Sequence, residues 1–219
     1  MSLLDFARGP ALDAAIAVFC LGVLWRLLSL LMLPRVTDRS IRRANAPSDF
    51  SAAVRGFFRH MWVPEPYRRA TLFSVLNGWV FHLGLAIIVF GFAQHILFIK
   101  GLFGLSWPGL PTGVISVAAV ITLASLLAAL TRRLTNPVLK LLSTGNDYFS
   151  WLVTFLPVIT GLVAVNHLFA AYETLLALHI LSVAAFLIWF PFGKLMHAFL
   201  VFITRTKTSI THARRGAEI

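Results

Sequence analysis

The feature that most constrains this chain is a set of five long apolar runs. The hydrocarbon core of a bilayer is about 30 Å thick, so a crossing helix needs about 20 mostly apolar residues. The runs cover residues 12–33, 75–99, 112–131, 148–169 and 174–203. Hydrophobic residues make up 58% of the 219 residues, which is more apolar surface than a soluble domain of this length can bury. The sequence therefore predicts an all-α integral membrane protein, one domain over 1–219 built as a bundle of five transmembrane helices.

The ends and interruptions of these runs carry further information. The first run follows mixed charges rather than a basic start, and it lacks a small-residue cleavage site, so we expect it to be a helix and not a signal peptide. Pro157 and Pro191 lie inside the fourth and fifth runs, where they predict kinks. The fifth run is longer than a simple crossing needs, so its end is expected to tilt or protrude.

Basic residues are concentrated in alternate connections. Eight arginines lie in 34–74, three basic residues in 132–147 and four in the C-terminal tail, whereas the opposite connections hold Arg8 and Lys100. Only an odd number of spans puts the three basic segments on one side. The positive-inside rule then predicts an outside N-terminus and a cytoplasmic C-terminus, in a bacterial or archaeal inner (cytoplasmic) membrane. The net charge of +11 reflects this topology and contact with anionic lipid, not nucleic acid.

The first basic connection, 34–74, is long for a link between helices. Its part 49–73 mixes Phe, Met and Trp with Arg. Such a composition is typical of a helix in the headgroup layer, and it also suits a docking platform for a cytoplasmic partner. The two readings are compatible, and this Arg-rich segment is expected to be cytoplasmic or interfacial.

Cysteine usage limits the cofactors that this chain can hold. A single cysteine, Cys20, excludes an internal disulfide and an iron–sulfur cluster held by this chain alone. There is no Cys-x-x-Cys-His stretch for covalent haem attachment and no Gly-rich nucleotide-binding loop. Histidine remains as the candidate metal ligand.

Four histidines form two predicted pairs. His179 and His197 are 18 residues apart, which is five turns and about 27 Å on a continuous helix, so one lies near each membrane surface. His82 and His95 lie in the second span, which runs antiparallel to the fifth. His82 is therefore level with His197, and His95 with His179. Two His–His pairs at two depths are typical of a membrane cytochrome b with two haems, or with one if a pair is not used.

The outer ligand on the second span is left open. Thirteen residues separate His82 from His95, which leaves them about 220° apart on an ideal helix, so a bulge or a rotation would be needed. His167, at the outer end of the fourth span, is the alternative partner of His179. A further alternative is that these histidines bond to neighbouring helix groups and bind nothing.

Two stretches carry a resemblance to a known family. These are "FHLGLAIIVFG" (81–91) and "HILSVAAFLIWFPFGKLMHAF" (179–199). Over most of its length the chain resembles the gamma subunit of respiratory nitrate reductase, a five-helix di-haem cytochrome b that oxidises quinol. The resemblance implies an inner haem held by His82 and His197 and an outer haem held by His179 and a second-helix histidine. In that family the second-helix histidines stand ten residues apart, a position that is Phe92 here. Related subunits also serve heterodisulfide-reductase-like and sulfite-reductase-associated complexes.

The expected function is electron transfer as one subunit of a larger oxidoreductase. A quinone or quinol would react near the outer haem, and electrons would pass through both haems to or from a cytoplasmic iron–sulfur partner. No catalytic residue is expected in the chain, which is not a complete enzyme alone. Lys100 could donate a hydrogen bond to a quinone carbonyl and Arg26 could pair with a haem propionate, and for both the alternative is snorkelling to headgroups. The alternative function is a haem-free membrane anchor that tethers a cytoplasmic complex.

Overall fold

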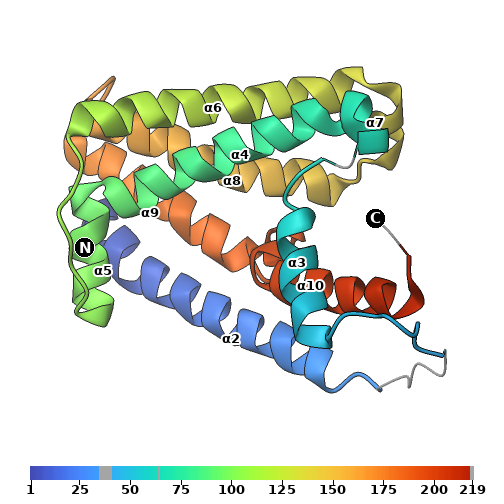
Figure 1. The fold of residues 1–219 in the computed structure, drawn as a ribbon. Coiled ribbons are helices and arrows are strands. Elements are labelled where there is room, and N and C mark those ends of the chain that lie inside the picture. The colour runs from blue at the N-terminus through green and yellow to red at the C-terminus, as the bar shows by residue number, and fades with distance from the viewer. Residues whose placement is uncertain (35–40, 64, 218–219) are drawn as a thin grey trace.

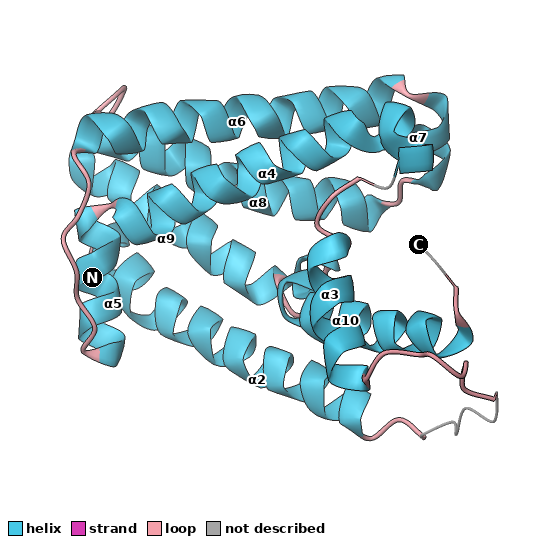
Figure 2. Ribbon diagram, in the orientation of Figure 1, coloured by secondary structure: helices cyan, strands magenta, loops and turns pink. Residues whose placement is uncertain are grey.

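The computed structural model describes residues 1–34, 41–63 and 65–217, and every regular element within them is helical (Figures 1 and 2). The helices are α1 (Leu3–Phe6), α2 (Leu12–Leu31), α3 (Asp49–Arg59), α4 (Arg68–Gly91), α5 (Ala93–Phe103), α6 (Thr112–Thr135), α7 (Pro137–Leu142), α8 (Gly145–Val165), α9 (Tyr172–Trp189) and α10 (His197–Arg215). A π-helical turn (Ala7–Ala11) joins α1 to α2, and single 3-10 turns (Glu65–Tyr67 and Lys194–Met196) precede α4 and α10.

Five helical segments are long and apolar enough to cross a membrane, which confirms the predicted number of spans. They are Leu3–Leu31, Glu65–Gly91, Thr112–Thr135, Gly145–Val165 and Tyr172–Trp189. Large apolar side chains on their outer faces remain exposed, such as Val117 at 60% and Leu24 at 52%. Such faces suit contact with lipid, because a bilayer does not penalise exposed apolar surface as water does.

Small side chains allow the central helices to approach closely. In Figure 1, α4, α6 and α8 run roughly along one direction, and α6 packs against both α4 and α8. Gly84 of α4 lies directly against Thr122 of α6, which is completely buried. The apolar core beside this crossing contains Ala119, Leu123 and Val158. Membrane helices pack through such small residues, since the bilayer supplies no hydrophobic force between them. Gly84 therefore serves helix packing.

The predicted second span, 75–99, is two helices. α4 ends at Gly91, Phe92 takes an extended conformation (φ −79°, ψ 126°), and α5 begins at Ala93. The loop before α6 explains the break, because Leu110 N–H donates to the Gly91 carbonyl at 2.8 Å and the Trp107 indole donates to the Phe90 carbonyl at 2.6 Å. Without these donors the two carbonyls would lack hydrogen-bond partners. An unsatisfied backbone group in hydrocarbon costs roughly several kcal/mol.

The predicted fifth span, 174–203, is interrupted near Pro191, where a kink was predicted, and the interruption divides it into two helices. α9 ends at Trp189, and α10 begins only at His197. Pro191 cannot donate to the helical ladder, and Gly193 takes an extended conformation (φ −95°, ψ −177°). Pro191 is buried against Gly22 of α2. By contrast, α8 continues through Pro157.

The Arg-rich segment contributes a helix, α3, that packs on the C-terminal helix α10. Asp49 forms a salt bridge with Arg214, whose Nε lies 3.1 Å from Asp49 Oδ1. The rings of Phe57 and Phe202 stack with centroids 5.5 Å apart, and Gly56 lies against Ser209. In Figure 1, α3 runs across the direction of α4 and α6. Two segments far apart in sequence thus form one helical pair.

Candidate functional site: two facing histidine pairs

The first pair, here called the inner pair after its predicted depth, is His82 of α4 and His197 at the start of α10. The two ring centroids are 6.1 Å apart and the ring planes are nearly perpendicular, at 87°. His82 Nδ1 lies 2.7 Å from the Gly78 carbonyl, and His197 Nδ1 lies 2.9 Å from the Lys194 carbonyl. Both histidines are exposed. Each ring is thus oriented by a backbone acceptor at Nδ1.

The second pair, the outer pair, is His95 of α5 and His179 of α9. Their centroids are 6.2 Å apart, and the planes are close to parallel, at 23°. His95 Nδ1 lies 2.9 Å from the Ile88 carbonyl, and His179 Nδ1 lies 3.3 Å from Thr160 Oγ1. Both side chains are partly buried. The outer pair is therefore more enclosed, and one of its rings is oriented by a hydroxyl group.

The Thr160 hydroxyl oxygen is placed to accept a hydrogen bond from His179 Nδ1–H. Its hydroxyl donates to the Leu156 carbonyl at 2.6 Å, while the neighbouring Ser182 hydroxyl donates to the His179 carbonyl at 2.7 Å. With both hydroxyl protons committed, the Thr160 oxygen can accept from His179 Nδ1–H. Gly161 then leaves room for the ring, because a Cβ at this position would lie 3.0 Å from His179 Cε1.

The break at Phe92 brings His95 to the same opening as His179. On a continuous helix a backbone carbonyl serves the residue four positions later. Here the Ile88 carbonyl at the end of α4 accepts from Phe92 N–H at 3.4 Å and also lies 2.9 Å from the ring nitrogen Nδ1 of His95, seven residues later. The offset of about 220° expected for an ideal helix therefore does not apply, because the axis changes direction at Phe92.

His179 and His197 reach their places by a different route from the predicted one. They were expected on one face of a continuous helix, but the chain turns between α9 and α10. His197 faces His82 because the turn sets the direction in which α10 begins.

The spacing within each pair suits a metal held between two imidazoles. A metal–imidazole nitrogen bond is about 2.0–2.1 Å, so two opposed ligands place their ring nitrogens about 4 Å apart and their centroids roughly 6 Å apart. The observed centroid distances are 6.1 and 6.2 Å. Occupation of Nδ1 by an acceptor in all four rings leaves Nε2 to bind a metal. This is the usual arrangement at metal-binding histidines.

The number of protein ligands limits the kind of metal centre. Within the described residues, no group of three or more His, Cys, Asp or Glu side chains is placed to hold a metal ion. A zinc site needs at least three such ligands, whereas a haem brings its own equatorial nitrogens and needs only one or two axial side chains. Each pair has the donor set of a bis-histidine haem site.

The remaining sequence candidates lie elsewhere. His167 is exposed in the turn after α8, has a positive φ of 53° and stacks on Tyr172 at 4.8 Å, so it does not join His179. Lys100 is exposed in the last turn of α5, about 140° around the helix from His95. Arg26 is exposed on α2, one turn after Gly22, the residue that packs on Pro191.

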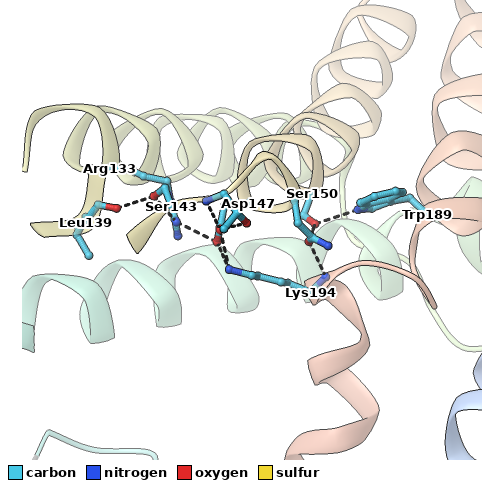
Figure 3. A network of polar contacts seen from close by, with 9 residues as sticks. Arg133, Leu139, Ser143, Asp147, Ser150, Trp189 and Lys194 are labelled. Carbon is cyan, nitrogen blue, oxygen red and sulfur yellow. Dashed lines mark hydrogen bonds and ion pairs between the residues drawn. The ribbon is translucent and has the colours of Figure 1, made fainter. Parts of the chain in front are cut away.

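Sequence reasoning missed the polar network that fixes the turn before α10 (Figure 3). Asp147 at the start of α8 accepts from Lys194 Nζ at 2.6 and 2.7 Å and pairs with Arg133 at 2.9 Å. The available signal was that Asp147 is the only acidic residue between Glu65 and Glu173. An isolated acid at the end of an apolar span calls for a partner.

The fold and the site together define a class: an all-helical, five-span membrane protein with two facing imidazole pairs. A protein of Nitratidesulfovibrio vulgaris (strain Hildenborough) is 30% identical to this chain over 220 residues, which cover 96% of this chain and 94% of the relative. The chain belongs to the same family as this protein. No family model matches the chain. No solved structure matches it either.

Proposed function

We propose that this protein is a membrane-anchoring cytochrome b subunit that passes electrons between the quinone pool and a cytoplasmic iron–sulfur partner. The observation that carries the proposal is the pair of centroid distances, 6.1 Å for the inner pair and 6.2 Å for the outer pair. Both agree with opposed axial ligation of one iron. The likeness to the gamma subunit of nitrate reductase rests on the same histidines.

The chain would contribute axial ligation and orientation. The acceptors at Nδ1 hold each ring as the neutral tautomer with a free Nε2, and they raise the basicity of that nitrogen. Haem, when bound, supplies one-electron redox chemistry that no side chain in this protein supplies. The four histidines are thus positioned for structural and electronic roles.

The exposure of the inner pair also supports a cofactor. His82 is exposed on the apolar helix α4, and His197 is exposed at the start of α10. A polar ring that faces hydrocarbon with an unsatisfied nitrogen is costly, by about 1–3 kcal/mol in protein mutational data. Iron ligation would satisfy Nε2, and a macrocycle would cover the rings. Gly78 has open space around it on the same side of α4, one turn before His82.

The proposed partner follows from the single cysteine of the chain and from the position of its Arg-rich segment. One cysteine is too few for an iron–sulfur cluster, so electrons must enter or leave through another subunit. The Arg-rich segment with α3, together with α10, is the proposed docking side for it, on the cytoplasmic face of the inner membrane. The predicted outside N-terminus is consistent with this orientation.

Arg26 and Lys100 are proposed to contact the haem propionate and the quinone, respectively, at the edges of the two histidine sites. Arg26 lies on α2, whose Phe19 contacts Phe199 of α10 with centroids 6.2 Å apart, so we assign it to a propionate of the inner haem. Lys100 points away from the His95 face, so its role as a donor to a quinone carbonyl requires a quinone bound at the outer end of α5. Snorkelling to headgroups is the competing outcome for both.

A difference spectrum of the purified protein, reduced minus oxidised, tests the proposal. We expect a b-type haem signal with two components. His82→Ala and His197→Ala should remove the same component, and His95→Ala and His179→Ala the other. His167→Ala is the matched control and should leave both. A wild-type protein without haem would overturn the proposal and favour a haem-free membrane anchor.

A further inference from the structure

A buried carboxylate lies beside the turn that leads to His197. The Asp147 side chain is only 6% exposed, although carboxylates are rarely buried without partners. Lys194 and Arg133 both pair with it, and the Thr144 hydroxyl and N–H each donate to Oδ2 at 2.9 Å. Removing both cations would be costly, because it would leave a buried charge without compensation.

Lys194 connects this carboxylate to the inner pair. Its Nζ binds Asp147, and its backbone N–H donates to Asn146 Oδ1 at 3.1 Å. Its carbonyl is the acceptor for His197 Nδ1 at 2.9 Å. The same residue is thus anchored to the start of α8 and hydrogen-bonded to the histidine ring.

The other end of the turn is fixed to the same helix. The Trp189 indole donates to Ser150 Oγ at 2.9 Å, and Gly193 lies so close to this indole that a side chain would not fit. Trp189 holds the start of the turn and Lys194 holds its end, both on the first turns of α8 (Figure 3). Loss of the Lys194 anchor would free the carbonyl that orients His197.

We propose that Asp147 is a positioning residue for His197, acting through Lys194; the inference rests on the proposed role of the inner pair as haem ligands. The carboxylate holds the Lys194 side chain, the Lys194 carbonyl holds the imidazole, and the imidazole faces His82. This linkage explains why a carboxylate is buried at the start of α8, and it serves the inner pair alone.

Three variants separate this linkage from general stability. Asp147→Asn and Lys194→Gln break it, whereas Arg133→Gln removes the other cation on Asp147 and leaves Lys194 in place. The Lys194 side chain is 56% exposed, so Lys194→Gln is expected to fold even if Asp147→Asn does not. In redox-titrated difference spectra we expect both breaking variants to lose inner-haem affinity about tenfold and to shift the inner-haem potential. The outer component and Arg133→Gln should match the wild type.

Amide hydrogen exchange in lipid nanodiscs supplies a readout that needs no haem. Residues 190–197 should exchange faster in Asp147→Asn and Lys194→Gln than in the wild type and Arg133→Gln. The double variant should behave like either single one, because both remove one linkage. A wild type without haem would overturn the proposed function, whereas this exchange pattern would still support the linkage. Unchanged exchange and potential in Lys194→Gln would overturn the inference.

Discussion

The inner and outer histidine pairs solve the same geometric problem with different supports. Both bring two rings to about the same separation, 6.1 and 6.2 Å. The inner rings are exposed and perpendicular, and each is oriented by a backbone carbonyl, that of Gly78 within α4 and that of Lys194 in the turn before α10. The outer rings are partly buried and near-parallel, and the Ile88 carbonyl orients His95 whereas the Thr160 hydroxyl orients His179. Substitutions on α8 should therefore reach the outer pair directly, whereas they reach the inner pair only through the turn before α10.

The largest expected effect comes from filling the space beside the outer pair. Gly161→Val would push the His179 ring away, since even a Cβ would lie 3.0 Å from it. Overpacking costs about 1–3 kcal/mol, which weakens binding by up to about a hundredfold, so the outer haem signal in the difference spectrum should be largely lost while the inner signal stays. Gly113→Ala is the control, because nothing lies within 4 Å of its added carbon. Equal loss of both signals would break the comparison.

A smaller effect is expected from the hydroxyl that supports His179. Thr160→Val removes the hydroxyl acceptor of His179 and leaves the Pro157 carbonyl as a partner of the ring. The variant should weaken the outer site about tenfold, measured as haem retention during titration with a competing haem acceptor. Thr154→Val is matched to it, because the Thr154 hydroxyl bonds only to the Ser150 carbonyl of the same helix. Should the two variants retain haem equally, the Thr160 contact has no role in ligation.

The ring planes predict a spectroscopic difference without any substitution. Perpendicular imidazoles, at 87°, leave two iron d orbitals nearly equal in energy, whereas near-parallel ones, at 23°, separate them. The oxidised protein should therefore give two low-spin ferric EPR signals, a highly anisotropic one from the inner haem and a rhombic one from the outer. Loss of the anisotropic signal in His82→Ala would assign that signal to the inner haem. Two signals of one type would contradict it.

The smallest effect concerns the contact between α3 and α10, the helix that begins at His197 of the inner pair. Hydrogen bonds from Arg214 lower the pKa of Asp49 below its usual value. A depressed carboxyl pKa stabilises the folded state above the unfolded pKa of about 3.9, and this contribution is lost as the pH falls through the folded value. The pairing should therefore loosen in acid, by a small amount because the pair is exposed and screened by salt.

Limited proteolysis of α3 between neutral and acidic pH measures this loosening. Asp49→Asn should be cleaved as fast at neutral pH as the wild type is in acid. Cleavage of the wild type that does not change with pH would show that Asp49 does not hold the pairing.

The heights of the histidines could be predicted from the sequence, but their directions could not. The rise per residue is a constant of the helix, so counting residues placed His82 level with His197 and His95 level with His179. Counting also predicted the number of spans. It failed at Phe92 and at the turn before α10, because it assumed that an apolar run is one helix. It also left His167 as a rival of His95, since a residue count does not show which way a ring points.

The sequence by itself determined that the chain is a five-span helical membrane protein with histidines at two levels, because hydrophobic length and helical rise depend on the local chain alone. Only the tertiary structure decided that the rings face each other. A helix in an apolar setting can end at Phe92 only if another segment supplies donors for its free carbonyls, and here residues 107–110 supply them. The turn before α10 likewise depends on Asp147 and Ser150 of α8. Both breaks thus depend on contacts between distant parts of the chain.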